Sequence, residues 1–390
     1  MKDRKKPAIR FKGFTEDWEQ CKAVDIAEYS KGNGYSKGDL TEIGTPIILY
    51  GRLYTKYQFS ISEVDTFATP KDGSVYSKGN EVIIPASGET AEDIARASAV
   101  EKTGVLLGGD LNVLRPFSFI NPLFLALTFS SGEPQKELAK KAQGKSVVHI
   151  HNSDIQEVSV SFPTRTEQDS IVTMFRNLDH LITLHQRKYD KLVNIKKSML
   201  EKMFPCDGKI VPDIRFSGFT EDWEQRKLGN EVIEILAGGD INKNKIVENG
   251  KYPIYANALT NGGIVGYYDD YYRVKAPAVT VTGRGEVGFA KARMTDFTPV
   301  VRLLAIRSNH DCYFLENAIN NHKVVVESTG VPQLTVPQLS SYSIFFPKNI
   351  EEETRIGEYF YNLDNLITLH QRKLEKLKNI KKSCLEKMFI

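Results

Sequence analysis

Residues 177–204 read NLDHLITLHQRKYDKLVNIKKSMLEKMF, and residues 362–389 read NLDNLITLHQRKLEKLKNIKKSCLEKMF, with 23 of 28 positions identical. An earlier segment is also repeated, because IRFKGFTEDWEQ at 9–20 returns as IRFSGFTEDWEQ at 214–225 with 11 of 12 positions identical. The early repeat has an offset of 205 and the late repeat an offset of 185. The two repeats therefore enclose inserts of unequal length, which do not resemble each other. The chain is a tandem duplication of one scaffold that presents two different surfaces.

The late repeat predicts a long helix with one apolar seam. Thr164 with Glu167, and Asn349 with Glu352 in the second copy, have the spacing of a capping box. Apolar residues then alternate at spacings of four and three, which is typical of a coiled coil. The seam positions are Ile171, Phe175, Leu178, Ile182, His185, Tyr189, Leu192 and Met199, and in the second copy Ile356, Phe360, Leu363, Ile367, His370, Leu374, Leu377 and Cys384. Pro205 and Gly208 end the first helix.

The two predicted helices have matching seams. From Glu167 to Phe204 there are 38 residues, which as a helix measure roughly 57 Å. A narrow apolar stripe of that length needs a cover, and the other copy has the same spacing. We expect an antiparallel pair, which would bring His185 and His370 together near the middle of the helices. For these histidines, a buried polar pair that fixes the register is favoured over a catalytic or metal-binding role.

The repeats divide the chain into five segments: a first domain at 1–163, a helix at 164–205, a linker at 206–213, a second domain at 214–348 and a second helix at 349–390. The early repeat holds the only two tryptophans, Trp18 and Trp223, and predicts a packing knot at the start of each domain, with base stacking as the alternative. The fold class predicted is α+β, with two pseudo-twofold-related mixed β/α domains separated by an antiparallel two-helix coiled coil.

Short β-rich runs bounded by turn residues dominate the inserts. Strands are predicted at Pro46–Tyr50, Glu81–Pro85, Tyr267–Val274, Ala278–Thr282, Val300–Ile306 and Ser341–Phe346, and helices at Asn121–Phe129 and Phe314–Asn320.

The charge, cysteine spacing and apolar runs of the sequence limit which classes of protein it can belong to. The net charge of +3 does not by itself indicate a polyanion partner. Residues 27–160 carry a net charge of −3 and residues 237–307 a net charge of +4, so a first domain that binds nucleic acid must gather its cations on one face. The four cysteines match no zinc or redox spacing, and no apolar run approaches the ~20 residues of a membrane span. We expect a reduced, cytoplasmic protein without a membrane segment.

Enzyme signatures are missing from the sequence. It contains no nucleotide-binding P-loop, no H-E-x-x-H, no G-x-S-x-G elbow and no paired Cys/His set. We therefore expect no catalytic residue, no metal site and no cofactor bound by this chain.

Polar, glycine-rich loops are the candidate binding elements. Arginine can pair with guanine, asparagine with adenine and lysine with phosphate, and glycine lets a loop approach closely. The candidate DNA contacts are Lys31, Asn33, Tyr35, Lys37, Arg52, Tyr54, Lys56 and Arg96 in the first insert, and Lys243, Asn244, Lys245, Asn257, Arg284, Lys291 and Arg293 in the second. For any single residue, a solvated turn is the alternative.

This order of parts resembles the DNA specificity subunit of type I restriction-modification systems. Each half opens with IRF-x-GF-x-x-x-W and closes with F-P before the long helix. The resemblance implies that the domains at 1–163 and 214–348 are target recognition domains, each reading one half of an asymmetric bipartite DNA target. It also implies that the coiled coil sets the spacer between the half-sites and docks methyltransferase subunits.

The resemblance further implies the partners: double-stranded DNA, two methyltransferase subunits and restriction/translocase subunits. S-adenosylmethionine, ATP and Mg are then expected on the partner subunits, and this chain is the non-catalytic member of an adenine methyltransferase/endonuclease complex. Two alternatives remain. A fused methyltransferase would need cofactor motifs that the sequence lacks, and a protein-interaction scaffold with two divergent binding domains would need none.

Overall fold

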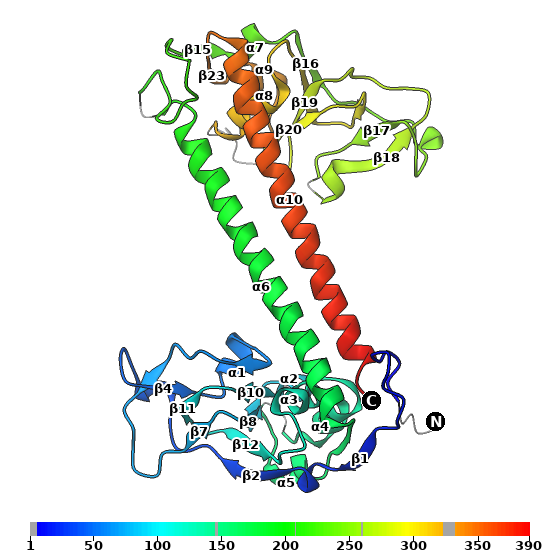
Figure 1. Ribbon diagram of the computed structural model, residues 1–390. Helices are drawn as coiled ribbons and strands as arrows, with labels where there is room; N and C mark the ends of the chain where they lie inside the picture. The colour runs from blue at the N-terminus through cyan, green and yellow to red at the C-terminus, as the bar shows by residue number, and fades with distance from the viewer. Residues whose placement is uncertain (1–5, 145–146, 207, 259, 323–331) are drawn as a thin grey trace. The chain divides into compact units, whose positions relative to one another are not determined.

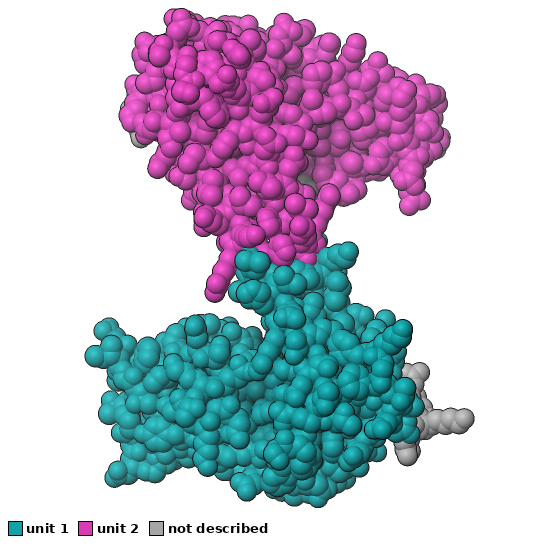
Figure 2. Space-filling view, in the orientation of Figure 1, with its two compact units in different colours: residues 1–184, 374–390 teal, residues 185–373 magenta. Residues whose placement is uncertain are grey.

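The computed structural model describes residues 6–144, 147–206, 208–258, 260–322 and 332–390 (Figure 1). The chain forms two compact units (Figure 2). Unit 1 comprises Met1–Leu184 with Leu374–Ile390, and unit 2 comprises His185–Lys373. Both long helices, α6 (Arg165–Lys202) and α10 (Ile350–Lys387), contribute residues to both units.

Unit 1 contains two five-stranded sheets, ordered β2-β12-β8-β10-β5 and β3-β6-β4-β11-β7. The first consists of β2 (Ala27–Lys31), β12 (Leu111–Pro116), β8 (Glu81–Pro85), β10 (Ser98–Val100) and β5 (Ser60–Ile61). The second consists of β3 (Leu40–Thr41), β6 (Phe67–Ala68), β4 (Thr45–Ile48), β11 (Thr103–Leu107) and β7 (Tyr76–Lys78). Two further pairs join β1 (Glu19–Lys22) to β14 (Ser159–Phe162) and β9 (Ser87–Gly88) to β13 (Val148–His149). The helices besides α6 are α1 (Arg52–Thr55), α2 (Ala91–Ile94), α3 (Pro122–Phe129), α4 (Gly132–Lys141) and α5 (Asn152–Gln156), with 3-10 turns η1 (Ala23–Asp25) and η2 (Lys37–Asp39).

Unit 2 also contains two main sheets, but they have fewer strands than those of unit 1. An antiparallel four-stranded sheet consists of β16 (Glu234–Ala237), β22 (Leu303–Arg307), β19 (Ala278–Thr282) and β20 (Ala290–Arg293). A three-stranded sheet consists of β18 (Ile264–Tyr268), β17 (Tyr252–Tyr255) and β21 (Thr298–Pro299), and β15 (Glu224–Lys227) pairs with β23 (Ser343–Phe346). The remaining elements are α7 (Leu228–Glu231), α8 (Cys312–Asn320) and α9 (Val336–Ser340), with 3-10 turns η3 (Lys243–Lys245) and η4 (Thr260–Gly263).

The dissimilar inserts share one backbone crossing. A Cβ on Gly32, after β2, would lie 1.9 Å from the carbonyl oxygen of Gly108, and a Cβ on Gly238, after β16, would lie 2.0 Å from that of Val300. A parallel bridge follows each crossing, Asn33 with Gly108 and Gly239 with Val300. Only glycine fits where two backbones approach this closely. The two inserts therefore have the same path at this point, although their sequences differ.

The predicted elements in the inserts are largely confirmed. β8 and β19 have the predicted bounds, and β4, β22 and β23 lie within theirs or shift by a few residues. The strand predicted over Tyr267–Val274 is wrong, because β18 ends at Tyr268 and the chain bends at Asp269 and Asp270. Adjacent aspartates favour turns. Asn121 caps α3 and Asp311 caps α8, so both predicted helices exist, whereas α4 was not predicted.

The long helices pair in antiparallel fashion inside each unit. In unit 2, Nδ1 of His185 lies 2.8 Å from Nδ1 of His370, and Lys196 pairs with Asp364 at 2.6 Å. In unit 1, Lys381 pairs with Asp179, which is the same contact shifted by 185. Residue numbers fall along one helix as they rise along the other. None of the predicted seam residues is exposed, so the coiled-coil interpretation and the histidine pair are confirmed.

The early repeat fastens the two helices together at both ends. In unit 1, the amide of Ile9 donates to the carbonyl of Lys387 at 3.0 Å, and Arg10 forms a bidentate pair with Glu167, both contacts at 2.7 Å. In unit 2, Ile214 donates to Lys202 at 2.9 Å, and Arg215 pairs with Glu352 at 2.6 and 2.8 Å.

The predicted capping role of the two glutamates is wrong, because their carboxylates bind these arginines instead. Asn349 does cap α10, since its Oδ1 accepts from Glu351 N at 2.8 Å. The predicted packing role of the tryptophans is confirmed. Trp18 and Trp223 are 4% and 2% exposed, and their rings contact Phe124 and Phe314.

The stability of unit 2 should depend strongly on the ion pair between Arg215 and Glu352. The Glu352 side chain is only 1% exposed, so Arg215→Gln leaves a buried carboxylate without its cation. We expect a loss of about 3–5 kcal/mol in the free energy of unfolding, measured by chemical denaturation. The double variant R215M/E352M, which removes both charges, should recover most of that loss.

The control is Arg165→Gln, since Arg165 and Asp169 form an ion pair with side chains 43% and 51% exposed. This variant should cost less than about 1 kcal/mol. An equal loss in R165Q and R215Q would show that burial does not decide the strength of these pairs.

Candidate nucleic-acid interface

Several predicted contacts in unit 1 are engaged inside the fold. The Arg52 side chain is 9% exposed and pairs with Asp65 at 2.7 Å, and Lys56 pairs with the same carboxylate at 2.5 Å. Arg96 lies over the rings of Tyr54 and Tyr57 and donates to the carbonyl of Leu53 at 3.2 Å. These cations hold α1, α2 and the neighbouring loops together. A DNA contact by any of them stays a prediction.

The loop after β2 is different, because it carries exposed cations on an anchored backbone. Asn33 Nδ2 donates to the carbonyl of Gly73 at 2.7 Å, and the hydroxyl groups of Tyr35 and Ser74 lie 2.6 Å apart. The side chains of Lys31 and Lys37 are exposed and form no hydrogen bond or ion pair among the described residues. Asn33 and Tyr35 therefore position the loop, while the two lysines remain available to a ligand.

The corresponding loop of unit 2 has the same form. After the glycine crossing, η3 follows as η2 does in unit 1, and the first residue of each turn is an exposed lysine, Lys243 or Lys37. Asn242 caps η3 by accepting from Asn244 N at 3.1 Å. Lys245 lies 3.6 Å from Asp270 in an exposed pair. The equivalence of Lys37 and Lys243 was not predicted, because no alignable sequence surrounds them.

Two other predicted contacts in unit 2 are structural in this conformation. Lys291 pairs with the buried Glu316 at 2.8 Å. Arg293 stacks 3.7 Å over the Tyr255 ring and donates to Thr280 Oγ1 and to the carbonyl of Gly262, both at 3.0 Å. Burial lowers the pKa of Arg293 from its usual value.

Asn257 joins three loops of unit 2. Its Oδ1 accepts from Gly283 N at 2.8 Å, and its Nδ2 donates to the carbonyl of Val301 at 3.1 Å. Arg284 follows Gly283 and is half-buried, and its Nε has no hydrogen-bond partner in the described part of the chain.

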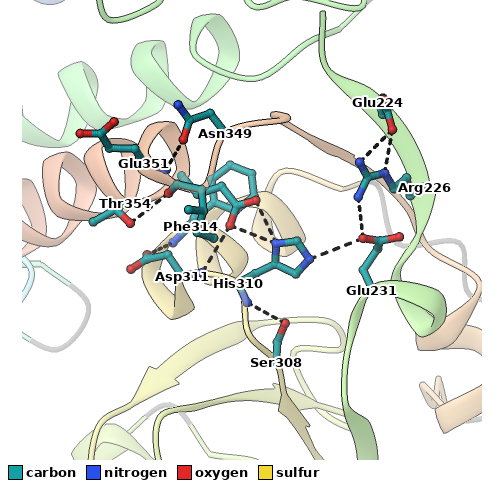
Figure 3. Close-up of polar contacts among 12 residues, drawn as sticks. Glu224, Arg226, Glu231, Ser308, His310, Asp311, Phe314, Asn349, Glu351 and Thr354 are labelled. Carbon is teal, nitrogen blue, oxygen red and sulfur yellow. Dashed lines mark hydrogen bonds and ion pairs between the residues drawn. The ribbon is translucent and has the colours of Figure 1, made fainter. Parts of the chain in front are cut away.

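A charged corner lies at the start of α10 in unit 2 (Figure 3). His310 Nδ1 lies 2.9 and 3.0 Å from the two oxygens of the buried Glu353 carboxylate, and its Nε2 lies 3.5 Å from Glu231. Glu231 also accepts from Arg226 at 2.8 Å. The His310 ring packs on Phe346 with centroids 4.5 Å apart. Burial by itself lowers the pKa of His310, but the hydrogen bond and charge of Glu353, with those of Glu231, outweigh it and raise this pKa above its usual value.

The same corner of unit 1 is uncharged. Phe119 packs on Phe162 with centroids 6.0 Å apart, in the place that His310 takes on Phe346. Gln168, at the position of Glu353, accepts from Asn121 N at 2.8 Å and donates to the carbonyls of Phe119 and Pro163. Equivalent places at the start of the long helices thus hold a neutral pair in unit 1 and a charged pair in unit 2.

The charged corner should make unit 2 pH-dependent. Because the pKa of His310 is raised in the folded state, its stabilising contribution is complete below the unfolded value of about 6.5 and is lost as the pH rises through the folded value. The variant H310F/E353Q copies the neutral pair of unit 1. The difference in melting temperature between wild type and this variant should favour the wild type most at pH about 6 and shrink by pH about 9.

His180, which is exposed on α6, provides the control, since H180Q should leave the pH profile unchanged. A constant difference between wild type and H310F/E353Q across this pH range would contradict a charged His310.

The structure gives few other candidate centres. Within the described residues, no group of three or more His, Cys, Asp or Glu side chains could hold a metal ion. Among the described helices, none is long and apolar enough to cross a membrane.

Two dissimilar α/β units on one repeated scaffold, each with an anchored loop that exposes cations, define a bipartite recognition protein. The comparisons identify its family. The profile described as type I restriction modification DNA specificity domain matches residues 15–194 and 220–379. The chain therefore belongs to the type I restriction-modification DNA specificity family, and its two recognition domains serve DNA sequence specificity.

Similar proteins cover nearly the whole chain. The type I restriction enzyme MjaVIII specificity subunit of Methanocaldococcus jannaschii is 21% identical over 397 residues, which cover 94% of this chain and 91% of the relative. The putative MjaX specificity subunit of the same organism is 24% identical over 405 residues, with the same coverage. The crystal structure of a type I restriction-modification S subunit from M. genitalium has a TM-score of 0.70 at 15% identity and covers 99% of both chains, which shows the shared fold.

Proposed function

We propose that this chain is the non-catalytic, DNA-reading subunit of an adenine methyltransferase/endonuclease complex that works in the cytoplasm. Each unit reads one half of an asymmetric bipartite target. The observation that carries this proposal is the shared glycine crossing with different residues beyond it, at Gly32 and Gly238. One backbone plan with two different loop sequences is what two half-sites of different sequence require.

The paired helices set the spacer between the half-sites. Each is 38 residues long, which corresponds to roughly 57 Å. Lys196 and Lys381 pair with Asp364 and Asp179 on the facing helix, so these contacts hold the register of the pair. A fixed register keeps the spacer constant.

Two methyltransferase subunits dock on the outer faces of the helices. Leu181 and Leu184 are 39% and 38% exposed, and their counterparts at offset 185, Leu366 and Leu369, are 46% and 45% exposed. Exposed leucines at matching positions of both copies fit two identical partners. S-adenosylmethionine belongs on those subunits, and ATP and Mg on the restriction/translocase subunits, while this chain binds none of them.

Exchange of one recognition segment tests the function. Residues 238–293 should be replaced by the corresponding segment of a relative, and methylated adenines mapped in the co-expressed methyltransferase complex. We expect one half of the recognised motif to change and the other half to stay. A change in both halves contradicts modular reading, and methylation without any motif favours a protein-interaction scaffold.

The docking surface gives a separate prediction. The variant L181N/L184N/L366N/L369N should keep the melting temperature of the isolated chain within a few degrees, because these side chains are already exposed, and should lose co-purification of the methyltransferase. The matched control is V193N. Val193 is 39% exposed, but its counterpart at offset 185 is Lys378, so this variant should still form the complex. Complex formation by the leucine variant would contradict this surface.

A further inference from the structure

Three arginines on strands of unit 2 are engaged by the fold, and two arginines on its loops differ from them. Arg226, Arg293 and Arg307 are held by internal partners: Glu231, the Tyr255 ring and Glu234. Arg284 and Arg302 have no acid partner among the described residues. Both lie on tight loops, Arg284 between β19 and β20, and Arg302 between β21 and β22.

The backbones of these two loops pack closely against each other. A Cβ on Gly283 would lie 2.2 Å from the carbonyl oxygen of Arg302. Gly283 N donates to Asn257 Oδ1, and the carbonyl of Gly283 accepts from Leu334 N at 3.0 Å. On the neighbouring loop, Leu303 N donates to the carbonyl of Val300 at 3.0 Å, which closes the turn that contains Arg302.

The arginines differ in setting. Arg284 is half-buried, and its Nε is buried without a hydrogen-bond partner from any described residue. A buried donor left unpaired costs free energy, and a ligand acceptor can supply the missing bond. Arg302 is exposed and has a left-handed backbone, with φ of 72°. A residue other than glycine at such an angle is uncommon and is kept where the surrounding structure determines it. Glu286, on the Arg284 loop, is exposed and forms no ion pair within the described residues.

We infer that Arg284 is a base-reading residue of unit 2, which pairs with a guanine edge in the major groove, and that Arg302 contacts a phosphate beside it. This inference rests on the proposed function. Arginine on a rigid loop presents two parallel N–H groups that match O6 and N7 of guanine. The more exposed Arg302 suits a sequence-independent phosphate contact. Asn257, which the sequence predicts as a DNA contact, is a positioning residue, because both ends of its amide are bound to the two loops.

The test uses the complex of the full chain with its methyltransferase subunit. Methylated motifs are mapped by single-molecule sequencing, and binding to duplexes that carry each base at every target position is measured over a range of salt concentrations. Arg284→Ala should lower the preference for guanine at one base pair of one half-site by about tenfold or more, and the other half-site should not change. Arg284→Lys, which keeps the charge without the fork, should show the same relaxation if it folds with the wild-type melting temperature.

Arg302→Gln should weaken binding to all sequences alike and reduce the slope of log affinity against log salt by about one, with the motif unchanged. Asn257→Ala should relax the motif at the same base pair as R284A, an outcome that a general loss of stability would not give. Lys275→Gln removes another exposed cation of unit 2 and, as the control, should leave the motif unchanged.

The possible outcomes distinguish a failure of the roles inferred for Arg284 and Arg302 from a failure of the proposed DNA-reading function. A wild-type complex with a bipartite motif, together with an unchanged motif in R284A and R284K, overturns the assignment of Arg284 alone. A motif altered by R302Q overturns the phosphate role. A wild-type complex that methylates without any motif overturns both the proposed function and this inference.

Discussion

The structure depends on where each long helix ends. Phe204, two residues after the end of α6, is buried in unit 2, with ring centroids 6.0 Å from Trp223 and 5.6 Å from Phe314. Its repeat, Phe389 after α10, is buried in unit 1, with centroids 5.7 Å from Phe124 and 6.0 Å from Phe175. Each core therefore includes the start of one helix and the end of the other. This exchange requires both helices to be continuous and antiparallel.

The exchange also explains why the repeated segments are so similar. The early repeat must contact the end of one helix through Ile9 or Ile214 and the start of the other through Arg10 or Arg215. A change in either helix would alter both cores, whereas the loops beyond the glycine crossings form no hydrogen bond or ion pair with a helix end among the described residues. The scaffold can thus keep its sequence while the recognition loops diverge.

Much of this scaffold was predictable because repetition and periodicity are visible in one sequence. The seam from Ile171 onward, the meeting of His185 with His370 and the burial of the tryptophans all follow from spacing and residue type. The arginine pairs of Glu167 and Glu352 were not predictable, because the capping-box pattern describes only local contacts and the competing arginines lie far away in sequence. The strand predicted after Tyr267 failed for a local reason, since Asp269 and Asp270 turn the chain.

The binding surface was predictable only in part. Residue type pointed to the polar loops, but it could not separate Arg293, which is stacked on Tyr255, from Arg284, whose Nε has no hydrogen-bond partner among the described residues. That distinction depends on tertiary contacts between three loops. Arg302, for which we infer a phosphate contact, was not among the predicted residues for the same reason, because that inference comes from its contact with Gly283 and not from its own sequence neighbours.

The central claim is that one chain reads two different half-sites. The most direct measurement is a map of the adenines methylated by the complex of the unaltered chain with its methyltransferase subunit, obtained by single-molecule sequencing of a DNA library. The account predicts a single asymmetric motif with two specified parts, a spacer of constant length and a methylated adenine in each part. A continuous motif, a palindromic one or a spacer of variable length would contradict it.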